Sequence, residues 1–349
     1  MGATIKDVAR RARVSIASVS RALNGTGVVT DSIRERVTRA AKQLRYTPHG
    51  GARSLITRRT HSIGVLLPDM YGEYFSELIR GIDRAARARN LHLLVSSTHG
   101  DADEAAELLR SMSGRVDGLL LMSPHVTGKF LAEAIPGALP AVLISTPDEL
   151  KQFTTLMIDN YGGARSVVTH LRNLGHRHIA HISGPANNFE SGERLRGYRA
   201  ALRGLAPPPG ASSAETIVAG DFTEESGYLA GRFIAALPQR PDAIFAANDM
   251  MAIGCLYALT EAGLRVPQDV ALAGFDDIPI ARYMQPALTT VRIQIAELGM
   301  RALEALVQRI RSPKDAGGGK QTLKTELVVR ASCGSTGQQN RAAGESSRR

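Results

Sequence analysis

Short apolar segments alternate with segments of helix length from about residue 62 onward, and this alternation limits the possible folds more than any other feature. The first series of apolar segments reads IGVLLP, LHLLVSS, DGLLLMSP and PAVLIST, and the second reads HIAHISGP, ETIVAG, DAIFAAN and VALAGF. Short continuous apolar strands separated by helices are typical of parallel sheets, because helices cover both faces of such a sheet. The two series therefore predict an α/β protein with two doubly wound parallel-sheet subdomains.

The charge of the chain is concentrated at its N-terminal end. The first 60 residues hold 13 Lys and Arg residues and only three acidic residues, which amounts to the whole net charge of +10. The remaining 289 residues carry 30 residues of each sign. Such an imbalance exceeds that of an ordinary solvated surface, so residues 1–60, the basic head, are expected to bind a polyanion.

Three short helices fit into the basic head. Their inward-facing residues recur at helical spacing: Ile5, Val8, Ala9 and Ala12, then Val19 and Leu23, then Ile33, Val37, Ala40 or Ala41, and Leu44. We expect Thr4 and Asp7 to form a capping box at the first helix, Ser15 to cap the second, and Thr30 or Asp31 to cap the third. The turn between the first two helices is only three or four residues long, which is the spacing of a helix-turn-helix DNA-binding unit.

The sequence lacks the common nucleotide-binding and catalytic motifs, so neither an enzyme nor a cofactor is expected. Cys255, Cys333 and the histidines do not show metal-ligand spacing, and the adjacent Asp276 and Asp277 would point in opposite directions at a strand end. No stretch is long and apolar enough to cross a membrane, and no secretory signal is visible. These features predict a cytoplasmic protein without a membrane partner.

Motifs along nearly the whole chain resemble the LacI/GalR family of bacterial transcriptional regulators. The head reads TIKDVARRARVSIASVSRALNG and continues through VTDSIRERVTRAAKQLRYTPH to ARSL. The body adds IDNYGGARS, HIAHISGP, ERLRGYRAAL, GDFTEESGY, AANDMMAIG, VALAGFDDIP and LTTVRI, in family order and spacing. The resemblance implies a small all-α helix-turn-helix domain, a hinge helix, and a ligand-binding core similar to periplasmic binding proteins, whose chain crosses between two subdomains three times.

The same resemblance implies the domain boundaries. We expect the headpiece at 1–48, the hinge helix at 49–60, the first core subdomain at 61–160 plus 292–316, the second at 161–290 plus 320–333, and a disordered tail at 334–349. A homodimer is expected because two operator half-sites need two heads. The tail shows no leucine heptads of the kind by which family members form tetramers, so no tetramer is expected by that route.

The resemblance further implies which head residues contact DNA. They are Thr4, Ser15, Ile16, Ala17, Ser20, Arg21 and Asn24 in the helix-turn-helix, and Ala52 and Leu55 in the hinge. Ile16, Ala17 and Arg21 would reach base edges, and an Arg–guanine pair is worth about 1–3 kcal/mol of discrimination. Arg36 would contact phosphate. Leu55, one from each subunit of a homodimer on a palindromic operator, would wedge into the minor groove. The alternative position for Ile16 is the core, but other apolar residues already fill the inner face.

Two features of the head depart from the family pattern. Arg13 stands where the helix-turn-helix turn usually has glycine, and a left-handed backbone costs roughly 1 kcal/mol for other residues. Gly50 and Gly51 begin the hinge, and each disfavours a helix by about 1 kcal/mol. The hinge helix is therefore expected to depend on DNA and on the partner subunit.

For the body, the resemblance implies an effector site between the two subdomains. Its residues are Tyr74, Phe75, Ser145, Arg194, Phe222, Asn248 and Asp276. Guanidinium and carboxylate groups can each bond to neighbouring hydroxyls, and Phe222 can cover the apolar face of a sugar ring. The alternatives are core packing for Phe222 and a turn role for Asp276. Ser145 stands where some relatives carry aspartate, which puts one hydroxyl contact in question.

The expected function is sequence-specific repression of carbohydrate-use genes, switched by a small sugar-like effector. A purine-responsive repressor is an alternative that the aromatic pair Tyr74 and Phe75 leaves open. A solute-binding transport protein would fit the body alone, but the basic head and the lack of a visible signal peptide oppose it. The effector's identity stays open, as does its role as inducer or co-repressor, because these roles differ only in the subdomain arrangement that is stabilised.

Overall fold

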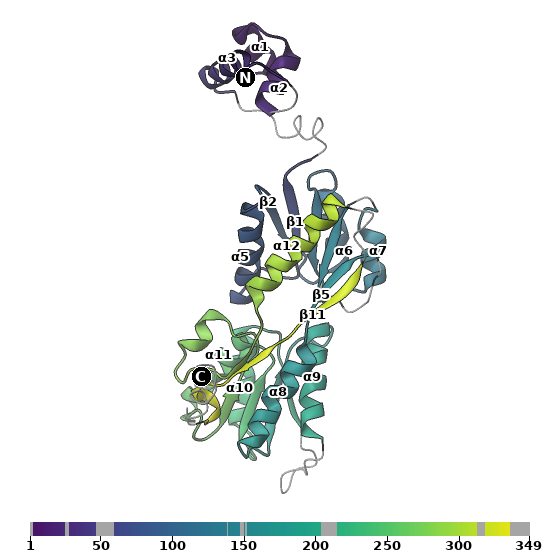
Figure 1. Ribbon diagram of the computed structural model, residues 1–349. Coiled ribbons are helices and arrows are strands. Elements are labelled where there is room, and N and C mark those ends of the chain that lie inside the picture. The colour runs from purple at the N-terminus through teal and green to yellow at the C-terminus, as the bar shows by residue number, and fades with distance from the viewer. Residues whose placement is uncertain are drawn as a thin grey trace, which may run out of the picture. The chain divides into compact units, whose positions relative to one another are not determined.

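The computed structural model describes residues 3–24, 28–46, 59–137, 139–146, 150, 152–203, 215–312 and 318–335 (Figure 1). The chain divides into two compact units, of which the first comprises the residues up to His61 together with Gly114–Asp117 and the second comprises the rest. Ala52, Leu55 and the Gly50-Gly51 pair lie outside the described residues, as does most of the expected hinge helix and tail. Within the described part, no helix combines the length and apolar character needed to cross a bilayer.

In its described part, the first unit contains the helices α1 (Ile5–Ala12), α2 (Ile16–Asn24) and α3 (Asp31–Gln43). All three contribute to one small core, whose buried residues are Val8, Ala9, Ala12, Val19, Val37, Ala40 and Ala41. These are positions that helical spacing predicts, because a short amphipathic helix buries one face. The helical head and its core are therefore confirmed.

The second unit has two lobes, each built on its own parallel sheet. The first-lobe sheet has the strand order β11-β5-β4-β3-β1-β2. Its strands are β1 (Ser62–Leu67), β2 (His92–Ser97), β3 (Gly118–Met122), β4 (Ala141–Ile144), β5 (Thr154–Ile158) and β11 (Gly319–Leu323). All their pairings are parallel. The inner strands β3 and β5 are buried throughout, whereas the edge strand β2 alternates in exposure, which explains the continuous apolar runs of the inner strands.

Four helices belong to the first lobe: α5 (Glu73–Arg87), α6 (Ala102–Met112), α7 (Gly128–Ala134) and α12 (Ile295–Arg311). Helices α5 and α12 lie side by side although they are far apart in the sequence (Figure 1). Glycine permits this close approach, since a Cβ atom at Gly81 would lie 2.0 Å from the carbonyl oxygen of Ala296. The C-terminal part of the chain thereby completes the first lobe.

The second-lobe sheet has the order β7-β6-β8-β9 and is also parallel. Its strands are β6 (Ile179–Ser183), β7 (Thr216–Ala219), β8 (Ala243–Ala246) and β9 (Ala271–Ala273). Its helices are α8 (Asn160–Asn173), α9 (Phe189–Leu202), α10 (Glu224–Ala235) and α11 (Asp249–Glu261). A short antiparallel pair, β10 (Thr290–Arg292) with β12 (Glu326–Val328), accompanies this lobe. The two parallel sheets confirm the predicted fold class.

The chain passes between the lobes after β5, after β10 and after β11, as the resemblance implies. One expected boundary is wrong. Strand β11 pairs with β5, from Gly319 opposite Thr154 to Leu323 opposite Ile158, so it belongs to the first lobe. The expected second-lobe segment 320–333 therefore belongs to the second lobe only from β12 onward. Strand order depends on pairing with distant residues, and local apolar patterning does not reveal it.

Candidate functional site

The accessible surface of α2 carries the residues expected to read DNA bases. The exposed fraction of Ile16 is 44%, and Ala17 and Arg21 are exposed as well. Val19 of the same helix is fully buried and supplies its core contact. Ile16 is therefore not a core residue, and all three side chains are accessible to a partner of the head.

The other described candidates for DNA contact are bonded within the head. Ser15 Oγ accepts a hydrogen bond of 3.1 Å from the amide three residues later and so caps α2. Thr4 donates from its amide and its Oγ1 to the Asp7 carboxylate, at 3.0 and 2.7 Å, and these bonds lower the pKa of Asp7. Asn24 Nδ2 donates to Ser20 Oγ at 3.2 Å. The bonds expected at the starts of α1 and α2 are present, while DNA contacts by these residues stay predictions.

The turn between α1 and α2 has a left-handed backbone at Arg13, with φ 51° and ψ 51°. The Arg36 guanidinium of α3 donates to the carbonyl oxygens of Ala12 and Arg13. Carbonyls at the C-terminal end of a helix lack partners within that helix, so Arg36 supplies what α1 itself cannot. Arg36 therefore has a structural role in the head through Nη2, while its contact with phosphate stays a prediction.

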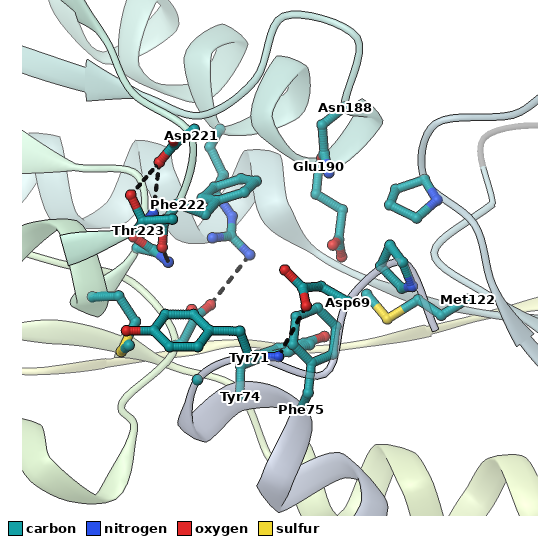
Figure 2. A pocket seen from close by; sticks show the side chains of 17 residues that line it. Asp69, Tyr71, Tyr74, Phe75, Met122, Asn188, Glu190, Asp221, Phe222 and Thr223 are labelled. Carbon is teal, nitrogen blue, oxygen red and sulfur yellow. Dashed lines mark hydrogen bonds and ion pairs between the residues drawn. The ribbon is translucent and has the colours of Figure 1, made fainter. Parts of the chain in front are cut away.

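A pocket in the second unit lies between the two lobes (Figure 2). Its lining residues follow the carboxyl ends of strands in both sheets, which is where doubly wound folds bind ligands. Six of the predicted effector-site residues line it: Tyr74, Phe75, Arg194, Phe222, Asn248 and Asp276. The structure therefore brings together residues that span some 200 positions of sequence.

Ser145 is the predicted site residue that does not line the pocket. Its side chain is buried, and its Oγ donates to Glu190 Oε1 at 2.7 Å. Glu190 itself lines the pocket, and the same Oε1 accepts a longer bond of 3.4 Å from Asn160. Ser145 thus acts on the pocket through Glu190, whose carboxylate it orients.

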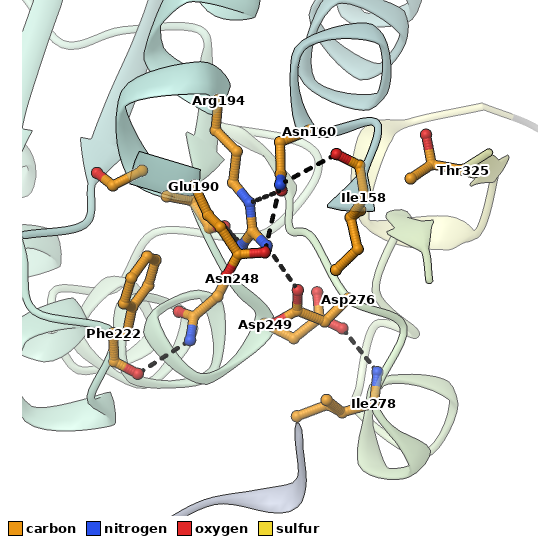
Figure 3. A network of polar contacts seen from close by, with 12 residues as sticks. Ile158, Asn160, Glu190, Arg194, Phe222, Asn248, Asp249, Asp276, Ile278 and Thr325 are labelled. Atoms are coloured by element: carbon orange, nitrogen blue, oxygen red, sulfur yellow. Dashed lines mark hydrogen bonds and ion pairs between the residues drawn. The ribbon is translucent and has the colours of Figure 1, made fainter. Parts of the chain in front are cut away.

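Arg194 is the centre of a buried polar network (Figure 3). Its Nε donates to Asn160 Oδ1 at 2.8 Å, and its Nη1 donates to the Ala247 carbonyl oxygen. Its Nη2 lies 3.2 Å from Asp276 Oδ1, and its Cζ lies 3.9 Å from the centre of the Phe275 ring. Each nitrogen of the guanidinium has a protein partner. Arg194 therefore primarily positions Asp276 and the surrounding loops.

Two buried polar atoms at the pocket have no aligned hydrogen bond within the described structure: Asp276 Oδ1, which has the 3.2 Å ion pair with Arg194 Nη2, and the Tyr74 hydroxyl. Burial raises the pKa of Asp276 to about 7, although the nearby Arg194 lowers it in part. Burial, with the charges of Glu190 and Asp276, also raises the pKa of Tyr74 well above its ordinary value. Buried polar groups in folded proteins nearly always have partners. Both atoms therefore retain unused hydrogen-bonding capacity at the pocket.

Backbone strain gathers at the same place. Phe222 has φ 74°, Asp276 has φ 113° and Ser145 has φ 55°. Positive φ angles such as these are unfavourable for residues other than glycine. Each such backbone conformation costs about 1–3 kcal/mol of folding free energy, and these conformations occur preferentially at functional sites. Asn248 helps to hold this geometry, because its Nδ2 donates to the Phe222 carbonyl at 2.9 Å while its Oδ1 caps α11.

The adjacent Asp276 and Asp277 diverge, as predicted. Asp276 lines the pocket, whereas Asp277 accepts bonds from Arg292 at 2.7 Å and from Arg330 at 2.6 Å. Asp277 therefore ties the second-lobe loops together and leaves Asp276 as the carboxylate available to a ligand.

Comparison with known proteins agrees with this architecture. Residues 4–49 match the family described as bacterial regulatory proteins, lacI family, and residues 168–333 match a periplasmic binding protein-like domain. The ribose operon repressor of Escherichia coli (strain K12) is 37% identical over 316 residues, which cover 89% of this chain and 94% of that protein. The chain belongs to the LacI family. It is a DNA-binding transcriptional regulator.

Two further similarities extend over the same length. The transcriptional repressor PurR of Edwardsiella ictaluri is 37% identical over 317 residues, covering 90% of this chain and 92% of that protein. The crystal structure of the lac repressor dimer bound to operator and the anti-inducer ONPF has a TM-score of 0.83 at 27% identity. That match covers 95% of this chain and 99% of the lac repressor chain. The LacI-family fold therefore includes both head and core.

The sequence analysis does not identify several lining residues of this LacI-family pocket: Asp69, Tyr71, Met122, Asn188, Glu190, Asp221 and Thr223. A usable signal exists for Asp69 and Asp221, because each closely follows an apolar strand at the edge where ligands bind. Glu190 carries no such signal. It lies in the first turn of α9, where an acidic residue is ordinary, and its burial becomes apparent only in the folded chain.

Proposed function

We propose that this LacI-family regulator is a repressor whose affinity for a palindromic operator is switched by a small polyhydroxylated effector bound between the lobes. The observation that carries the proposal is a pocket lined from both lobes in which two buried polar atoms, Asp276 Oδ1 and the Tyr74 hydroxyl, keep unused hydrogen-bonding capacity although Asp276 is ion-paired with Arg194. A sugar hydroxyl can accept from one and donate to the other. The similarity to a ribose operon repressor favours a sugar as the effector. The similarity to PurR leaves a purine as the alternative effector, and the experiment below distinguishes the two.

The head supplies the DNA side of the proposed switch. Exposed Ile16, Ala17 and Arg21 on α2 would enter the major groove. A homodimer would place two heads on two half-sites, with Leu55 of each subunit as a minor-groove wedge. The head carries the whole net charge of +10, so operator affinity should fall steeply with salt, by about 0.9 in log K per log salt for each phosphate neutralised.

Hydrogen bonds between the lobes offer a route by which a ligand in the pocket would change the arrangement of the two lobes. The Tyr71 hydroxyl donates to the Glu224 carboxylate at 3.0 Å, and the amide of Ile280 donates to the Glu73 carboxylate at 3.0 Å. Tyr71 lines the pocket as well. A ligand that contacts both lobes favours the arrangement in which all these bonds form, and this differential affinity is what a switch requires.

The proposal is tested with the full chain and a fluorescent operator duplex, with free sugars and purine bases added separately. At least one sugar should change operator affinity several-fold, and Asp276→Asn should abolish that change while leaving ligand-free operator affinity intact. Asp103→Asn, an exposed residue of α6, is the matched control and should respond like the unaltered chain. An unchanged sugar response in the Asp276 variant would place the effector site elsewhere, and a response to purines alone would replace the sugar.

A further inference from the structure

We infer that the pocket of this regulator selects an uncharged polyol and rejects anionic derivatives such as sugar phosphates and sugar acids. The inference rests on the proposed function, since it concerns the effector of that same pocket. Three features of the pocket support it: the charges of the lining residues, the bonding of Arg194, and the hydrogen-bonding capacity that the lining leaves unused.

The lining is strongly acidic. Among the described residues it contains four carboxylates, Asp69, Glu190, Asp221 and Asp276, and one cationic side chain, Arg194. Glu190 and Asp276 are 6% and 3% exposed, so solvent screens them poorly. An anion that enters the pocket would therefore meet an excess of like charge in a region of low dielectric.

Arg194, the cationic side chain among the described lining residues, has few hydrogen-bond donors left for an anionic ligand. Arg194 already contacts Asp276, donates to Asn160 and to the Ala247 carbonyl oxygen, and stacks on Phe275. A bound phosphate would have to compete with the carboxylate of Asp276 for the same guanidinium. Sites that recognise phosphate instead present free Arg forks or rows of unbonded amides.

Two of the lining carboxylates, Asp69 and Asp221, have hydrogen bonds to nearby loop groups. Asp69 accepts bonds from the backbone amides of Met70 and Tyr71, at 2.6 and 3.0 Å. Burial raises the pKa of Asp221, but hydrogen bonds from Thr223 and Ser226 outweigh it and hold that pKa below its ordinary value. Both side chains are exposed. They therefore add repulsion along the approach to the pocket.

The unused bonding capacity calls for hydroxyl groups. Asp276 Oδ1 has an ion pair with Arg194 but no aligned hydrogen bond, and the Tyr74 hydroxyl has no hydrogen-bond partner among the described residues. A sugar hydroxyl both donates and accepts, so it can serve both atoms, whereas an ionised phosphate or carboxylate oxygen only accepts. Together with the acidic lining, this makes a neutral, hydroxyl-rich molecule the complementary ligand.

The test uses isothermal titration of the full chain with matched probes: D-ribose against D-ribose 5-phosphate, and D-glucose against D-glucose 6-phosphate and D-gluconate. The neutral member of the pair that binds should have a Kd at least about 100-fold lower than its anionic counterpart, equivalent to roughly 2.7 kcal/mol. Equal or tighter binding of a phosphate or gluconate would overturn the inference and leave the sugar switch standing. A panel in which no sugar or derivative binds would overturn both.

Charge-neutral variants show whether the acidic lining causes the discrimination. Asp69→Asn keeps an acceptor for the two loop amides and removes one exposed charge, so it should fold normally. We expect Asp69→Asn to reduce the preference for the neutral ligand, measured as the Kd of the anionic ligand divided by that of the neutral one, several-fold. Glu190→Gln should reduce this preference further, because the Glu190 carboxylate is buried. The control is Asp103→Asn, which removes an exposed charge from α6 outside the lining. Equal ratios in Asp69→Asn and the control would contradict the electrostatic explanation.

Discussion

The Arg36 guanidinium on α3 donates a 3.1 Å hydrogen bond to the carbonyl oxygen of Arg13, the one residue of the helix-turn-helix turn with a left-handed backbone. The same guanidinium also bonds the Ala12 carbonyl. An arginine from the third helix thus holds the turn that sets the direction of the second. This arrangement accompanies the replacement of the family's usual glycine by Arg13, and it makes the turn dependent on a tertiary contact.

Arg36→Ala should destabilise the head by about 1.5–3 kcal/mol, because it leaves helix-end carbonyls without a charged donor. Amide hydrogen exchange of the full chain should show faster opening in α1 and at the start of α2, with the core lobes unchanged. Arg39→Ala, which removes an equal charge from an exposed position of α3, is the control. Equal exchange in both variants would show that the Arg36 bonds contribute nothing to the turn.

Arg13→Gly should slow exchange in the same helices, by up to about 1 kcal/mol of local stability, because glycine adopts a left-handed backbone without steric cost. The Arg13 side chain is exposed, so little packing is lost. Faster exchange in the glycine variant would mean that the greater freedom of the unfolded chain outweighs the relief of strain.

Arg21→Ala should cost about 1–3 kcal/mol on the preferred operator and flatten the base preference at one position of each half-site. The reason is that an exposed arginine on α2 can pair with a guanine edge. Fluorescence anisotropy on operator and on random duplex would measure both losses. Arg39→Ala should weaken the two duplexes about equally, and the same pattern in Arg21→Ala would exclude base reading.

Gly184→Ala should weaken effector binding by on the order of tenfold or more, because a Cβ there would lie 2.3 Å from Cζ of Phe222 and displace the ring that lines the pocket. Titration with the effective sugar would measure the change. Gly192→Ala is the matched control, since a Cβ there meets nothing within 4 Å. An unchanged Kd in the Gly184 variant would remove Phe222 from the binding surface.

Asp276→Asn should change how stability depends on pH. The pKa of Asp276 is about 7 in the folded chain against about 3.9 for an unperturbed aspartate, so its stabilising contribution is complete below about pH 4. That contribution is lost as the pH rises to about 7, by up to about 1.4 kcal/mol per pH unit. Asparagine does not titrate. Calorimetry should therefore show the Tm of the variant rising relative to the unaltered chain between about pH 5 and 7. A constant difference in Tm would contradict the raised pKa.

Local patterns in the sequence determine a large part of this protein. Helical spacing identifies the core of the head at Val8, Val19 and Val37, and a serine before an apolar helix identifies the cap at Ser15. The continuous apolar runs identify both parallel sheets, because a strand covered on two faces needs no polar residue. The family motifs add six of the residues that line the pocket. Each of these inferences depends on neighbours in sequence or on motifs of fixed spacing.

Only the tertiary structure decides the remaining features, since they depend on contacts between distant segments. The pairing of β11 with β5 places the last strand in the first lobe. The approach of Arg36 to Arg13 gives Arg36 a role in supporting the turn that local patterning does not reveal. Folding buries the carboxylate of Glu190 in the pocket lining, and it leaves the guanidinium of Arg194 already bonded to other protein groups. Charge, burial and partner are properties of a position in space, and a sequence specifies them only once the chain has folded.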